Sequence, residues 1–127
     1  MSILDVHLEK LRESPSCANA DLARNPDGSA VVTVPAVPLP QGWSKAAVTV
    51  KFVAPVGYPH AKPDCFWADA DLTLLGGGQP QASNMTPIPG SAQPLRWFSW
   101  HISHWDPNRD SFFTYVNVIR ERFKDCR

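Results

Sequence analysis

Apolar residues recur with a helical period at both ends of this chain and form short runs between them. In residues 3–13 they come every three or four positions among charged residues, which predicts an amphipathic helix that ends before Pro15. A second set lies on one helical face near the carboxyl terminus: Phe112, Tyr115, Val116, Ile119 and Phe123. That stripe predicts a closing helix, with Asp106 or Asp110 as its cap and Pro107 in its first turn.

The residues between the two helices predict strands. β-Branched runs at residues 30–34 and 46–53 fit two strands, and residues 65–68 fit a short third one. A turn is expected at residues 25–28. The prolines of residues 35–40 restrict that segment to pairing at the edge of a sheet.

A stretch rich in glycine and proline, residues 69–94, follows the third predicted strand. A loop of this length without structure of its own is unusual and is often functional. Alternatively, three leucines form a fourth short element in it: Leu72, Leu74 and Leu75. The order of helix, three or four strands, irregular stretch and helix predicts an α+β domain with an antiparallel meander.

Composition narrows the class of protein. With 127 residues and a mass of 14.0 kDa, the chain is expected to form one domain over residues 1–127. The 12 basic residues balance the 12 acidic ones, and this zero net charge argues against nucleic acid as a partner. No signal peptide and no membrane-spanning stretch is visible, which predicts a cytoplasmic protein that does not associate with membranes and keeps its three cysteines reduced.

The segment at residues 95–107 stands out because three of the five tryptophans lie in it. If it is extended, one face carries the apolar residues Phe98, Trp100 and Ile102. The other face carries Trp97, Ser99, His101, Ser103 and Trp105. An imidazole between hydroxyls suits base-assisted attack, so Ser99 is the candidate nucleophile, His101 the candidate base and Ser103 an alternate. The other interpretation is a solvated strand face without chemistry.

Two further kinds of site have candidates. A metal site could use His101 and His104 with Cys65 or Asp106, but the H-x-x-H spacing matches no compact zinc motif, so neither a metal nor another cofactor is expected. Among the thiols, Cys65 is the best alternate nucleophile and ranks below Ser99, because no cysteine has an adjacent histidine or a C-x-x-C partner. His104 is an alternate catalytic residue.

Several short motifs occur in an order that resembles ubiquitin-conjugating (E2) enzymes. Residues 57–63, G-Y-P-H-A-K-P, resemble the Y-P-x-x-P-P motif of those enzymes, and W-D-P at residues 105–107 resembles their W-x-P before a helix. The nearest match is the bacterial branch called prokaryotic E2 family E. The chain resembles that branch in P-L-P-Q-G at residues 38–42, P-D-C-F-W at residues 63–67 and F-S-W-H at residues 98–101.

The resemblance covers about residues 30–123 and implies a UBC-like fold. That fold consists of an N-terminal helix, an antiparallel meander, an irregular active-site stretch and a C-terminal helix, here without the last helices of conventional E2 enzymes. The chain also departs from the conventional pattern. Residues 69–94 lack the H-P-N tripeptide, and the position of the thioester cysteine falls at Trp97 when the chain is registered on Trp105 without gaps.

What the resemblance implies is an E2-like carrier in a bacterial conjugation pathway. Such a carrier accepts the C-terminus of a ubiquitin-like protein from an E1-like adenylating enzyme and passes it to a target protein, in operons that also encode a JAB-type isopeptidase. Without the thioester cysteine, Ser99 would hold this C-terminus as an oxyester, with His101 as base and Asn84 as a candidate oxyanion donor. The alternative is a catalytically inactive E2-variant adaptor that binds the E1-like enzyme or the ubiquitin-like protein through its exposed aromatic face.

Overall fold

The first helix begins directly after Ser2, which is its N-cap. The structure, a computed structural model, describes residues 2–127. Helix α1 spans Ile3–Arg12, and the Ser2 hydroxyl accepts a hydrogen bond from the Asp5 backbone N–H at 3.3 Å. The Asp5 carboxylate accepts one in return from the Ser2 backbone, which completes a capping box. The predicted N-terminal helix is therefore confirmed, and a short 3₁₀ turn follows it at Pro15–Cys17.

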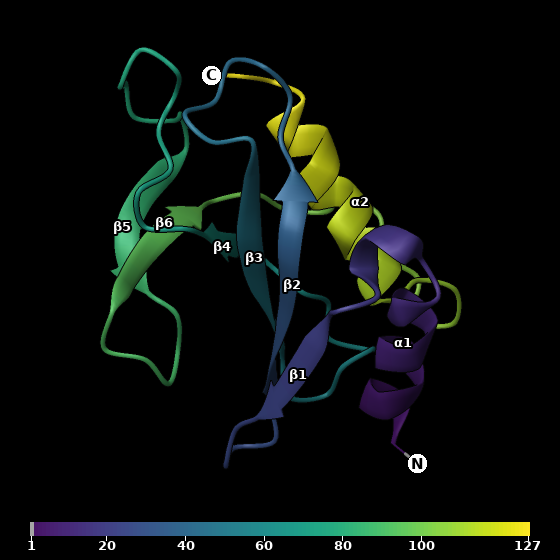
Figure 1. Cartoon of the computed structure of the whole chain (residues 1–127). Coiled ribbons are helices and arrows are strands. Elements are labelled where there is room, and N and C mark those ends of the chain that lie inside the picture. Colours follow the sequence, from purple (N-terminus) through teal and green to yellow (C-terminus); the bar gives the residue numbers. More distant parts are fainter. Residues whose placement is uncertain (1) are drawn as a thin grey trace.

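A six-stranded antiparallel sheet forms one layer of the molecule, in the order β1-β2-β3-β4-β6-β5 (Figure 1). The strands are β1 (Asp21–Arg24), β2 (Ala30–Pro38), β3 (Ala47–Ala54), β4 (Phe66–Ala68), β5 (Ser83–Pro87) and β6 (Pro94–Phe98). The expected α+β class with antiparallel pairing is confirmed, but the expected count of three or four strands is wrong. The two strands at the sheet edges, β1 and β5, are short and mostly exposed, so they carry little hydrophobic signal.

The proline-rich end of β2 behaves as the sequence predicts. Strand β1 pairs with β2 only as far as Thr33, so the rest of β2 has a neighbour on one side alone. The register shifts between Val34 and Val37, where Ala36 adopts a left-handed φ of 58°. The segment pairs at an open edge of the sheet, where a missing proline N–H breaks no ladder hydrogen bond.

The region at residues 69–94 is more ordered than a loop. It contains β5, and Leu74 forms an isolated bridge with Trp43 while Leu72 is fully buried. Leu75, in contrast, is 66% exposed. The prediction of a long irregular stretch is therefore wrong for residues 83–87, and the alternative of a short element around the leucines is partly right.

Helix α2 spans Phe112–Phe123, and its predicted apolar stripe is buried as expected. Its N-cap is Ser111, whose backbone N–H donates to the Thr114 hydroxyl at 3.1 Å, so the predicted caps Asp106 and Asp110 are wrong. Pro107 likewise lies before the helix. The two carboxylates organise the preceding loop instead, where the Asp106 N–H donates to the Asp110 carboxylate at 2.7 Å.

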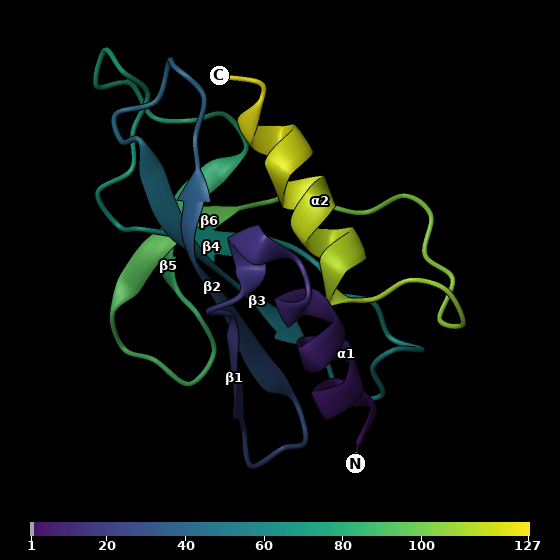
Figure 2. The same cartoon turned by 45° about the vertical axis from the view of Figure 1, so that its right-hand side comes forward.

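Both helices lie against the same face of the sheet (Figures 1 and 2). Aromatic side chains from β3, β4, β6 and α2 form the core between the sheet and α2: Phe52, Phe66, Phe98, Tyr115 and Phe123. Within residues 2–127, no helix is long and apolar enough to span a membrane. The result is the truncated UBC-like architecture that the motifs imply, with two α-helices covering one face of the meander.

Candidate active site

The candidate nucleophile lies at the point where β6 leaves the sheet. Phe98 is fully buried and pairs with Phe66 and Ser83 on the neighbouring strands, so it fixes the end of β6. The backbone N–H of Ser99 donates to the Ala82 carbonyl at 2.8 Å, and the chain then turns out of the ladder. Ser99 is half-buried at the end of a strand that is paired on both sides.

The candidate base reaches both the serine and a carboxylate. His101 Nε2 lies 3.5 Å from Ser99 Oγ, and His101 Nδ1 hydrogen-bonds to Asp64 Oδ1. The side chains of His101 and Asp64 are 58% and 54% exposed, so the pair lies in solvent-accessible space. A hydroxyl, an imidazole and a carboxylate thus contact one another in the order used by serine nucleophiles. The structure therefore places the two principal predicted site residues together.

Asp64 is a candidate site residue that the sequence analysis did not name. It is brought to His101 by the residue that follows it, Cys65, which has a left-handed φ of 61° and donates its N–H to the Trp100 carbonyl at 3.0 Å. From α2, the buried Tyr115 hydroxyl lies 2.7 Å from the Cys65 carbonyl and 3.2 Å from the Trp100 carbonyl. These bonds hold the Asp64 segment beside the His101 segment. The available signal was the P-D-C-F-W motif, which contains Asp64.

Cys65, which the sequence analysis named as the alternate nucleophile, also lies in this cluster. Its Sγ, an Asp64 carboxylate oxygen and a His101 ring nitrogen lie within 4.8 Å of one another. Burial raises the pKa of the Cys65 thiol, the charge of Asp64 raises it further, and hydrogen bonds from the Trp100 backbone and from Trp97 and Ser99 oppose this. The net effect keeps the thiol protonated, which lowers its reactivity as a nucleophile.

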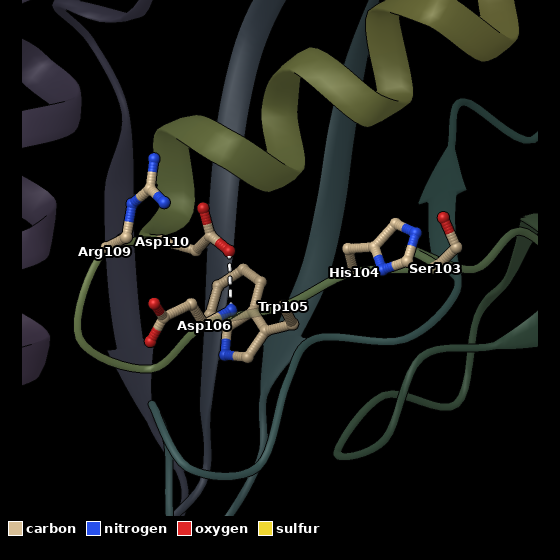
Figure 3. Close-up of a pocket in the computed structure, with 6 residues that line it drawn as sticks. All are labelled: Ser103, His104, Trp105, Asp106, Arg109 and Asp110. Atoms are coloured by element: carbon tan, nitrogen blue, oxygen red, sulfur yellow. Dashed lines mark hydrogen bonds between the residues drawn. The ribbon is translucent and has the colours of Figure 1, made fainter.

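The alternates Ser103 and His104 line a cavity of about 540 Å³ with Trp105 and polar residues of the loop before α2, and Ser103 also borders the groove lined by His101 (Figure 3). In that view the His104 ring and the Asp106 carboxylate lie to either side of Trp105. Among residues 2–127, the cluster with metal-ligand spacing comprises Asp64, Cys65 and His101. His104 and Asp106, which the sequence suggested as partners of His101, do not take part in it.

Trp105 does not share the exposed face with Ser99, which corrects the alternating pattern expected for residues 95–105. The regular strand ends at Phe98, and Trp105 packs against the buried Tyr58 with ring centroids 6.0 Å apart. Its indole N–H donates to the Pro59 carbonyl at 2.7 Å. The Trp105 side chain therefore connects the W-D-P segment to the Y-P segment, which is a structural role.

Asn84 lies on the other side of β6 from the Asp64 cluster. It pairs with Trp97 in the sheet, and its side-chain oxygen accepts the backbone N–H of Met85 at 2.8 Å. Its proposed part as an oxyanion donor stays a prediction. Closer to the imidazole, a groove of about 380 Å³ runs between residues 100–103 and α2, and His101 is one of its lining residues.

A family model described as Prokaryotic E2 family E matches residues 18–125. The chain belongs to this family. No curated protein and no solved structure gives a significant match. The resemblance found in the motifs is confirmed, and the match extends beyond the span of about residues 30–123 that carried it. The family E chain is an E2-like protein whose Ser99, His101 and Asp64 form one hydrogen-bonded group.

Proposed function

We propose that this family E chain is an E2-like carrier that accepts the C-terminus of a ubiquitin-like protein as an oxyester on Ser99. Membership of the family supports an E2-like role with a ubiquitin-like protein and an E1-like enzyme as partners. The observation that carries the chemistry is the contact of Ser99 with His101 and of His101 with Asp64. A serine hydroxyl is a weak nucleophile at neutral pH, and an oriented imidazole is the group that activates it.

The loading reaction transfers an acyl group from sulfur to oxygen. His101 Nε2 takes the proton of Ser99 as Oγ attacks the carbonyl carbon of the thioester that joins the ubiquitin-like protein to the E1-like enzyme. The tetrahedral intermediate collapses, the C–S bond breaks, and the departing thiolate takes the proton from the imidazolium. Asp64 orients the imidazole and stabilises its positive charge during this step. The separation of 3.5 Å between Ser99 Oγ and His101 Nε2 is expected to shorten when the substrate is bound.

The second step passes the acyl group to an amine of the target protein. His101 takes the proton that the amine loses as its nitrogen attacks the ester carbonyl, and donates this proton to Oγ as the C–O bond to Ser99 breaks. An oxyester is less reactive than a thioester, so positioning of the amine has to supply more of the rate. The groove between residues 100–103 and α2 is the proposed path of the extended tail, because His101 lies at its wall.

A second candidate function is the catalytically inactive adaptor. One observation favours it: the Ser99 backbone N–H donates to the Ala82 carbonyl, so it is not free to stabilise an oxyanion. In that case the exposed residues around His101 would form a binding surface for the E1-like enzyme or the ubiquitin-like protein.

One experiment separates these functions. The chain is incubated with the E1-like enzyme of its operon, the ubiquitin-like protein and ATP, and adducts are measured by intact-mass spectrometry. An adduct that hydroxylamine cleaves, that resists thiol reductant and that is lost in Ser99→Ala but kept in Ser103→Ala supports the oxyester. An adduct cleaved by thiol and lost in Cys65→Ala moves the nucleophile to Cys65. Absence of any adduct while the E1-like enzyme is charged supports the adaptor.

A further inference from the structure

Three different ligand atoms converge beside Ser99. An oxygen of Asp64, the sulfur of Cys65 and a ring nitrogen of His101 all lie within 4.8 Å of one another. Carboxylate oxygen, thiolate sulfur and imidazole nitrogen are the ligands that Zn²⁺ takes in proteins. We propose that Asp64, Cys65 and His101 bind Zn²⁺, and that the bound ion prevents the loading of Ser99. The second half rests on the proposed function, whereas the metal site itself does not.

The backbone brings these ligands together before any ion arrives. Consecutive residues of an extended chain point their side chains to opposite faces, and the left-handed conformation of Cys65 breaks that alternation. The Cys65 N–H is bonded to the Trp100 carbonyl, and the Tyr115 hydroxyl bonds to the carbonyls of both residues. The segment with Asp64 and Cys65 is thereby fixed to the segment with His101. Binding an ion then needs only small side-chain movements.

The chemistry of the cluster selects zinc over the hard cations. Mg²⁺ and Ca²⁺ prefer sites made of oxygen, whereas a thiolate and an imidazole favour Zn²⁺. Asp64 and His101 are more than half exposed and Cys65 is half-buried, so an ion can enter from solvent. Three protein ligands leave the fourth tetrahedral position to water.

A zinc ion bound here removes the base that the loading reaction needs. A neutral imidazole has one nitrogen with a free lone pair and one that carries a proton. If Zn²⁺ takes the lone pair of either His101 nitrogen, the other nitrogen is protonated and cannot accept the proton of Ser99. Zinc binding and loading of Ser99 therefore exclude each other.

Cobalt tests the metal site without reference to conjugation. The reduced chain is titrated with Co²⁺, and the visible d–d bands and the near-ultraviolet thiolate-to-cobalt band are recorded. We expect both in the wild-type chain, loss of the thiolate band in Cys65→Ser, its retention in the control Cys126→Ser, and displacement of the bands by Zn²⁺. Absence of the thiolate band in the wild type, or its persistence in Cys65→Ser, would overturn the site.

Loading assays test the consequence of binding. Adduct formation is measured against free Zn²⁺, each variant is normalised to its own rate without zinc, and charging of the E1-like enzyme is followed in the same samples. Loss of even an outer-shell partner typically weakens metal affinity by about 10- to 100-fold, so loss of a ligand in Cys65→Ala should raise the half-inhibiting zinc concentration by roughly tenfold or more. Equal inhibition of both chains contradicts the proposed block. If Ser99 takes no adduct even without zinc, the proposed function fails, while the cobalt spectrum still decides the metal site.

Discussion

Tyr115→Phe is the sharpest test of how the fold builds the site. The hydroxyl of this fully buried side chain bonds to the carbonyls of Cys65 and Trp100 at 2.7 and 3.2 Å, and burial raises its pKa. A net hydrogen bond contributes about 0.5–1.5 kcal/mol, and a buried acceptor left without a partner costs about 1–3 kcal/mol. Because the ring itself is kept, we expect a loss of about 2 kcal/mol in the free energy of unfolding.

Urea unfolding measures this loss, and a domain of this size should also melt roughly 6–10 °C lower. The same substitution frees the Cys65 segment from the Trp100 segment, so the contact between Asp64 and His101 loosens. A displacement near 1 Å in a catalytic group lowers rates by up to about 100-fold, and we expect loading of Ser99 to fall by about tenfold or more.

Tyr58→Phe is the matched control. Its hydroxyl bonds to His7 Nδ1 of α1 at 2.6 Å and not to the segments that carry Asp64 and His101, so the variant should lose about 1 kcal/mol of stability and load at the wild-type rate. A Tyr115→Phe chain that unfolds within about 0.5 kcal/mol of the wild type would refute the reasoning on stability. Equal loading by the two tyrosine variants would refute the link between Tyr115 and the site.

Asp64, His7 and Gly42 each lead to a further prediction. Asp64→Asn keeps the shape of the side chain but removes its charge, so the loading rate in single-turnover assays should fall by about 10- to 100-fold with wild-type stability; an unchanged rate excludes Asp64 from the reaction. Burial lowers the pKa of His7 from its ordinary 6.5, so stability present above pH 6.5 is lost as the pH falls below that value. Urea unfolding at pH 7.5 and 5 should show a larger drop for the wild type than for His7→Asn, and equal drops would contradict this. Gly42 has a φ of 118° and an added Cβ would lie 2.8 Å from the Cys126 sulfur, so Gly42→Ala should destabilise by about 1–3 kcal/mol. Gly76→Ala, which meets nothing within 4 Å, is its neutral control in the same thermal melts.

The parts of the fold that could be predicted are those in which local sequence and burial agree. Both helices carry an apolar stripe, and the central strands β2 and β3 alternate buried and less buried residues along their length. The edge strands β1 and β5 have no buried positions, and they form because a neighbouring strand offers hydrogen bonds to them. Such pairing depends on the assembled sheet, which a local pattern does not encode.

The candidate site likewise has one contact that the sequence suggests and one that it does not. Ser99 and His101 are two residues apart, and their contact follows from local geometry that the spacing already suggests. The contact between His101 and Asp64 spans 37 residues and depends on the left-handed Cys65 and on Tyr115 from α2. No periodicity in the sequence relates these positions, so the third member of the group required the structure.

The position of Asp64 also bears on which nucleophile the site can use. Burial raises the pKa of the Cys65 thiol and the negative charge of Asp64 raises it further, so both disfavour the thiolate that a thioester mechanism needs. The same charge favours attack by Ser99, because a positive imidazolium forms on His101 as the hydroxyl loses its proton. One carboxylate thus has opposite effects on the two candidate nucleophiles. The electrostatics of this site therefore suit a hydroxyl that is activated in the transition state better than a thiol that must ionise beforehand.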